Sequence, residues 1–180
     1  MFPMRKISII LLSAFLLSCS HDYKASTLDL AFYQWNFWAE EGASLEAMSD
    51  PGCGWDDMHR GVGKLVRIPA TVGEHFSPDY AGVSWLHTRF TLPELWEGRK
   101  IFLDFEGANG NVQVFLEGEE VASHALTTSG FSLELTEHIF YTRDNHLVIR
   151  LADPRPGKGG ITGGLRLRSE VPETNSSLEQ

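Results

Sequence analysis

The sequence predicts an all-β fold, a β-sandwich of jelly-roll type that spans residues 28–168. Apolar and polar residues alternate with period two over several short runs, which is typical of strands with one buried face. Turns that contain glycine or proline separate these runs. Because hardly any stretch carries a helical period, we expect two layers of strands with little helical cover.

The clearest alternation lies between residues 83 and 118. Its first run places Leu86 on one face and Trp85 on the other, and two more runs follow at residues 101–105 and 112–116. Residues that tolerate tight turns close each run. The pattern therefore predicts short antiparallel strands that follow one another along the chain.

Other parts of the chain carry the same alternation more weakly. The stretch from residue 40 to residue 62 has no clear period, so we expect a long loop there, with one helical turn at most, near residues 45–48. Pro69 stops a strand because it cannot donate a hydrogen bond to a sheet. Further strands are expected at residues 28–40, 65–69, 131–136, 146–151 and 165–168.

The N-terminus has the pattern of a bacterial lipoprotein signal over residues 1–18. A basic pair precedes an apolar run at residues 7–17 that is shorter than the roughly 20 residues needed to span a bilayer. A membrane-spanning helix is the alternative. The resemblance to lipoproteins implies cleavage before Cys19, lipidation of Cys19 and anchoring in the bacterial cell envelope, with Ser20 favouring the outer membrane. Residues 19–27 are expected to be a polar tether.

Length and charge limit the function. Removing residues 1–18 takes away two basic residues and no acidic one, so the formal net charge changes from −9 to −11, which disfavours nucleic acid as a partner. The remaining chain suits one domain, followed by a polar tail at residues 169–180, and is too short to add a (β/α)₈ barrel of about 250 residues. Cys53 is the only other cysteine, so we expect no internal disulfide once Cys19 is lipidated.

Several short motifs follow one another in a fixed order along the chain. They are Pro69-Ala70-Thr71, Gly82-Val83-Ser84-Trp85-Leu86, Leu103-Asp104-Phe105-Glu106-Gly107, Val114-Phe115-Leu116-Glu117-Gly118, His124 and Gly159-Gly160-Ile161. In this order they resemble the N-terminal sugar-binding domain of glycoside hydrolase family 2, the β-galactosidase and β-glucuronidase family. This resemblance implies a galactose-binding-like fold over most of the chain.

Carbohydrate binding needs aromatic rings that stack on sugars and side chains that hydrogen-bond hydroxyl groups. We assign Trp35 and Trp85 to the core, and for Trp38 and Trp55 we leave packing and exposure equally open. In the family, loops of this domain reach the sugar site, and Asn109 and the loop at Asp153 match them in position. The candidate binding residues are Trp38, Trp55, Tyr80, Asn109, Asn111, His124 and Asp153.

No catalytic residue is expected in this chain. Glycoside hydrolysis needs two carboxylates that face each other, whereas neighbours such as Glu40-Glu41, Asp56-Asp57 and Glu119-Glu120 point to opposite sides of an extended chain and suit solvated turns. The Asn-Glu dipeptide of the family's catalytic barrel is missing from the sequence. None of the seven histidines has the spacing of a zinc pair, so we predict neither a metal nor a cofactor.

These observations predict a non-catalytic, carbohydrate-binding or accessory lipoprotein whose partners are an oligosaccharide or polysaccharide and the membrane. One alternative is a fragment or split subunit of a β-galactosidase-like enzyme, with the barrel on a separate chain. Another is a scaffold that docks a protein and has no sugar site.

Overall fold

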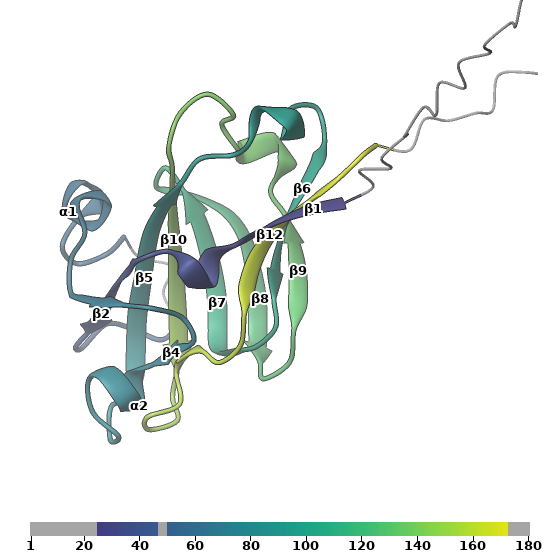
Figure 1. Ribbon diagram of the computed structural model, residues 1–180. Coiled ribbons are helices and arrows are strands. Elements are labelled where there is room, and N and C mark those ends of the chain that lie inside the picture. The colour runs from purple at the N-terminus through teal and green to yellow at the C-terminus, as the bar shows by residue number, and fades with distance from the viewer. Residues whose placement is uncertain (1–24, 47–49, 173–180) are drawn as a thin grey trace, which may run out of the picture.

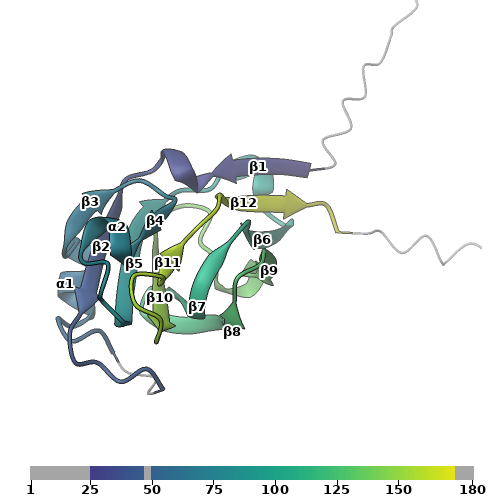
Figure 2. The ribbon, with the colours of Figure 1, turned by 90° about the horizontal axis from the view of Figure 1, so that it is seen from below.

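The computed structural model describes residues 25–46 and 50–172, which form two antiparallel sheets packed face to face (Figures 1 and 2). The prediction of an all-β sandwich is confirmed. The smaller sheet has the order β1 (Ala25–Asp29), β12 (Leu165–Glu170), β6 (Lys100–Phe105) and β9 (Phe131–Glu134). The larger sheet has the order β3 (Lys64–Val66), β2 (Trp35–Glu40), β5 (Gly82–Phe90), β10 (Asn145–Asp153), β7 (Ala108–Leu116), β11 (Gly160–Ile161) and β4 (Ala70–Thr71), and β8 (Glu119–Thr127) pairs with β7.

Helical segments are short and lie outside the sheets. Across residues 25–46 and 50–172, no helix has the length and apolar character needed to cross a membrane. The predicted signal at residues 1–18 and the lipidated Cys19 lie outside the described residues. The segments are η1 (Leu30–Phe32), α1 (Trp55–Arg60), α2 (Val72–His75), η2 (Glu94–Trp96) and η3 (Thr136–His138).

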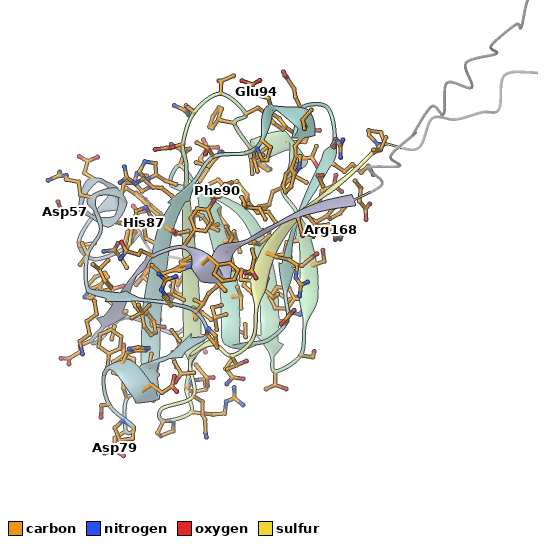
Figure 3. The ribbon with its side chains drawn as sticks, in the orientation of Figure 1. Asp57, Asp79, His87, Phe90, Glu94 and Arg168 are labelled. Carbon is orange, nitrogen blue, oxygen red and sulfur yellow. The ribbon has the colours of Figure 1, made fainter. Side chains whose placement is uncertain are left out.

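The main core lies between the two sheets. The inner faces of β5 and β6 supply Leu86, Phe90, Leu103 and Phe105, none of which is more than 3% exposed, and Figure 3 labels Phe90. Inward residues alternate with outward ones along each strand, which is why period two marked these strands in the sequence.

The expectation of one strand over residues 28–40 is wrong, because the chain changes sheets there. Asp29 ends β1 and accepts a hydrogen bond at Oδ1 from the backbone N–H of Ala31, which begins the turn of η1. Trp35 then opens β2 in the other sheet, and its Nε1 donates to the carbonyl of Leu30. β1 also begins at Ala25, so the last residues of the expected tether pair with β12.

The three central runs are strands, as predicted, but they do not pair with one another. β5 and β7 flank β10 in the larger sheet, whereas β6 pairs with β12 and β9 in the smaller one. Among the strands of this region, β7 pairs with its successor β8, through a tight turn at Glu117 and Gly118. Both turn residues have positive φ, at 53° and 89°.

A second apolar cluster covers the outer face of the larger sheet. We call Met58, Val83, Trp85, Phe115, Val148 and Ala152 the outer cluster. The helical turn expected near residues 45–48 lies partly outside the described residues; the described part of residues 40–62 contains α1, at Trp55–Arg60, and its Met58 packs onto this face. β5 is therefore buried on both sides, with Trp85 at 0% exposure.

Candidate functional site

The outward residues of β10 mark two openings on this face. His146, Val148 and Arg150 follow each other at every second position and so point to the same side of the sheet. Val148 lies in the outer cluster, whereas His146 contacts the rings of one pocket and Arg150 lines a groove. The outer cluster thus separates two sites.

The groove lies across β7, β8 and β10 and has a volume of about 350 Å³. We call it the sheet groove. Arg150 Nη1 donates to Gln113 Oε1 at 2.8 Å, and Gln113 Nε2 donates to Glu120 Oε2 at 2.9 Å. Because these side chains come from adjacent strands, they form a polar row that fixes the carboxylate of Glu120. The lining residues that matter below are Asn111, Gln113, Glu120, Ser123, His124 and Arg150.

Arg150 is the anchor of this row, although it is only 2% exposed. Its Nη2 donates to the carbonyl of Ser44 at 2.7 Å, and its guanidinium carbon lies 5.8 Å from the centre of the Trp85 ring. Burial lowers the pKa of Arg150, and the nearby carboxylates of Glu40 and Glu120 partly offset this effect. Arginine remains charged even so, and the row holds a rigid donor beneath the groove.

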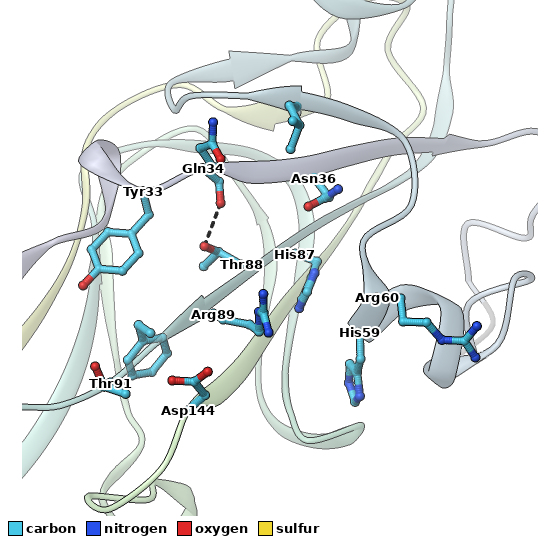
Figure 4. A pocket seen from close by; sticks show the side chains of 12 residues that line it. Tyr33, Gln34, Asn36, His59, Arg60, His87, Thr88, Arg89, Thr91 and Asp144 are labelled. Carbon is cyan, nitrogen blue, oxygen red and sulfur yellow. Dashed lines mark hydrogen bonds between the residues drawn. The ribbon is translucent and has the colours of Figure 1, made fainter.

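The second opening is larger, at about 440 Å³, and lies between β2, β5, α1 and the start of β10 (Figure 4). We call it the histidine pocket. Its lining is mostly polar, and Thr88 Oγ1 donates to the carbonyl of Gln34 at one wall. The lining residues that carry its chemistry are Asn36, His59, Arg60, His87, Arg89 and Asp144.

Three histidines from three elements meet here, because His59 and His87 line the pocket and His146 contacts both of them. His87 Nε2 and His146 Nδ1 are 3.2 Å apart and share a hydrogen bond, and the ring centre of His59 is 4.5 Å from that of His146. Burial, followed by the charges of His146, His59 and Arg89, lowers the pKa of His87 to about 4. Burial also lowers the pKa of His59. Within the described ranges, no group of histidine, cysteine or acidic side chains is arranged to hold a metal ion.

Adjacent acidic residues in the sequence do not turn their two carboxylates toward each other. A solvated turn was expected for Glu40, and this expectation is wrong. Its carboxylate accepts hydrogen bonds from Trp85 Nε1 at 2.6 Å and from the N–H of Gly52 at 2.8 Å. Asp57 pairs with Arg60 on α1. These carboxylates lie outside the sheet groove, whose acidic lining residues are Glu46 and Glu120.

Two curated proteins are similar to this chain in sequence. A β-galactosidase of Thermoanaerobacter pseudethanolicus is 29% identical over 106 residues, which cover 58% of this chain and 14% of that protein. A β-glucuronidase of Formosa agariphila is 25% identical over 85 residues, or 46% of this chain and 9% of that protein. The chain is related to family 2 glycoside hydrolases. No protein-family model matches it.

Solved structures agree on the fold. The β-glucuronidase of an uncultured Clostridium species has a TM-score of 0.65 and 16% identity, over 84% of this chain and 30% of that one. A β-glucuronidase of Bacteroides uniformis has a TM-score of 0.63 and 19% identity, over 81% of this chain and 18% of that one. The chain thus spans less than a third of these glycosidases.

The sugar-site residues expected from the family 2 resemblance do not meet on one rim. Asn111 and His124 both line the sheet groove, although His124 lies in β8 and stacks on Phe131 with ring centres 4.0 Å apart. Asn109 Nδ2 donates to the carbonyl of Lys158 instead. Asp153 is 1% exposed, and its carboxylate accepts hydrogen bonds from Arg155.

The aromatic side chains among the candidate sugar-site residues are engaged in packing. Trp38 and Trp55 both pack on the outer cluster, and Trp55 lies 5.1 Å from Phe115 between ring centres. The hydroxyl of Tyr80 donates to the carbonyls of Val83, at 2.6 Å, and Glu40, at 3.1 Å. The packing alternative left open for the two tryptophans therefore describes them best.

Sequence reasoning missed Gln113, Glu120 and Arg150, and it missed the histidine pocket. Gln113 and Arg150 sit at outward positions of strands that looked like ordinary amphipathic ones. The sequence offered one signal, a polar residue at an outward position of each of three strands. This signal could be used only with the knowledge that the three strands are adjacent in the sheet. The histidines lie too far apart in sequence to form a motif.

Proposed function

We propose that this family 2 relative is a non-catalytic carbohydrate-binding domain whose sugar site is the sheet groove. The observation that carries the proposal is the polar row of Arg150, Gln113 and Glu120 across three adjacent strands. Asn111 and Ser123 are exposed beside it. An amide, a carboxylate and a hydroxyl in one open groove suit the hydroxyl groups of a sugar ring.

Preorganisation supports the proposal. Arg150 and Gln113 are at most 8% exposed and already hydrogen-bonded, so binding would immobilise few additional side chains. The groove volume of about 350 Å³ falls within the range of small-ligand sites. Glu120 accepts only one bond from Gln113 in this row, and its carboxylate has further lone pairs for a sugar hydroxyl.

Isothermal titration after a glycan-array screen tests this proposal, with β-galactosides, β-glucuronides and plant polysaccharides as ligands. Loss of one neutral hydrogen bond in Asn111→Ala should weaken binding about fivefold, and loss of a charged acceptor in Glu120→Gln should weaken it roughly tenfold or more. Gln34→Ala is the matched control, because Gln34 is exposed in the other opening. Absence of glycan binding, or equal loss in all three variants, would contradict the groove assignment.

A second candidate is an accessory part of a glycosidase whose catalytic barrel is on a separate chain. Both relatives in sequence are glycosidases, a β-galactosidase and a β-glucuronidase, which supports this possibility. Hydrolysis of chromogenic β-galactosides and β-glucuronides should then require the partner chain. Turnover by the purified chain alone would overturn the proposal that it is non-catalytic.

A further inference from the structure

We propose that the histidine pocket is a separate binding site for an oxyanion, a sulfate or carboxylate group, and that its histidines take up protons when the anion binds. The pocket lies on the opposite side of the outer cluster from the sheet groove, so this inference stands apart from sugar binding there.

The first support is an arginine side chain at the pocket that has no acidic partner. Arg60 and Arg89 both line the pocket, against Asp144 alone among the acidic side chains. Arg60 is held by Asp57 at 3.2 Å, whereas the side chain of Arg89 makes no hydrogen bond or ion pair with any residue that the structure describes. Arg89 is exposed and lies beside the opening in Figure 4. In a chain of negative net charge, a guanidinium left without a carboxylate favours an anionic ligand.

The second support is the arrangement of buried polar atoms. His87 is 3% exposed, and its Nδ1 has no hydrogen-bond partner among the described residues. The same holds for Nε2 of His59. The rings of His59, His87 and His146 lie 4.5 to 6.0 Å apart between centres. A proton on any of them needs a nearby negative charge, since it would otherwise be buried beside two like groups.

The acidic side chains around these rings supply too little negative charge to stabilise a protonated histidine. α1 brings Asp56 as well as Arg60, the β7–β8 turn brings Glu117, and the segment before β10 brings Arg143 and Asp144. Glu117 already accepts the N–H of His146 and lies 3.9 Å from Arg143. The positive and negative groups thus nearly balance, and a bound oxyanion would tip the balance toward protonated histidine.

Polar groups on the walls complete the site. Asn36 and Gln34 offer amide donors, and Thr91 offers a hydroxyl, within a volume of about 440 Å³. An oxyanion accepts such bonds at several oxygens and is also attracted by the charge of Arg89. A neutral sugar lacks this charge–charge attraction. Binding that brings protons with it strengthens as pH falls, by the linkage between the two equilibria.

The test titrates the purified protein with sodium sulfate and, separately, with sodium acetate, at pH 5.5 and pH 7.5, with sodium chloride holding the ionic strength constant. The histidine ring proton signals in NMR spectra report binding, and calorimetry in two buffers of different ionisation enthalpy reports proton uptake. We expect saturable binding that is at least about fivefold tighter at pH 5.5, with net proton uptake. The stronger of the two anions identifies the group.

Variants of charged residues should change the affinity for the anion in opposite directions. Arg89→Gln should weaken binding about tenfold, as for loss of a charged hydrogen bond, while Asp144→Asn should tighten it. Arg166→Gln removes a half-buried arginine of the smaller sheet, which pairs with Glu106 far from the pocket, and should leave affinity unchanged. Equal effects of Arg89→Gln and Arg166→Gln, affinity independent of pH, or no saturable binding of either anion would overturn the proposal.

Discussion

His87 should make the fold less stable in mild acid, and His87→Gln should remove that effect. Burial, with the charges of His146, His59 and Arg89, lowers the pKa of His87 from 6.5 to about 4 in the folded state. Between these two values the unfolded chain binds more protons at this position than the folded chain does. The native state is therefore fully favoured above pH 6.5 and loses stability as the pH falls toward 4.

The magnitude follows from this window. At pH 5 an unfolded histidine is mostly protonated while His87 stays mostly neutral, which corresponds to roughly 1.5–2 kcal/mol of lost stability relative to pH 7.5. The lower end allows for solvent screening at the edge of the histidine pocket. Glutamine keeps a donor for His146 Nδ1 at this position and does not titrate, so the variant should lose this part of the pH dependence.

Urea denaturation followed by tryptophan fluorescence, at pH 7.5 and pH 5, measures the effect. The quantity of interest is the pH-dependent change in unfolding free energy of the wild type minus that of His87→Gln, because contributions from carboxylates cancel in this difference. Thr88→Val is the control, since it removes a buried hydrogen bond to the carbonyl of Gln34 without a titrating group. A difference below about 0.5 kcal/mol for His87→Gln would refute the argument.

Two further predictions concern the outer face. Trp55→Ala should lower the unfolding free energy by about 2–3 kcal/mol, because the contacts with Trp85 and Phe115 are lost, and urea denaturation should show it; a loss under 0.5 kcal/mol would contradict the packing role. Gly118→Ala should cost about 1–2 kcal/mol in the same assay, since φ is 89° and the new Cβ would lie 3.3 Å from the Trp55 ring. Gly98→Ala separates backbone strain from the contact with Trp55, because φ is 76° there and the new Cβ would have no atom within 4 Å. An equal cost of the two substitutions would mean that the contact with Trp55 adds nothing.

Local alternation was enough to find most strands. Leu103 and Phe105 on β6, like Leu147, Ile149 and Leu151 on β10, repeat every second position and are buried as that period requires. The same signal failed at Leu30, where Asp29 caps a helical turn and the chain crosses between the sheets. A short capping interaction overrides the pattern there, and the sequence around it looks like one continuous strand.

The assignment of Trp35 and Trp85 to the core is confirmed, since both are 0% exposed, but two other tryptophans could not be assigned from the sequence. Trp38 and Trp55 had equal claims to packing and exposure, because whether a tryptophan is covered depends on what reaches it from elsewhere in the chain. α1 covers Trp85 from outside the sandwich, and residues 40–62 have no helical period that would have predicted this helix. Asp153 resembled a loop acid but is buried against Arg155.

The sequence by itself determined the strand pattern, the all-β class and, through motifs kept in order, the relation to family 2 glycoside hydrolases. These depend on neighbours in the chain, which a linear pattern records. Tertiary structure alone decided the two sites. Gln113, Glu120 and Arg150 form a row only because β7 lies between β8 and β10, and His59, His87 and His146 meet only because α1 folds onto β5 and β10. Long-range strand order and helix docking minimise the free energy of the whole chain, so no local stretch encodes the contacts that they create.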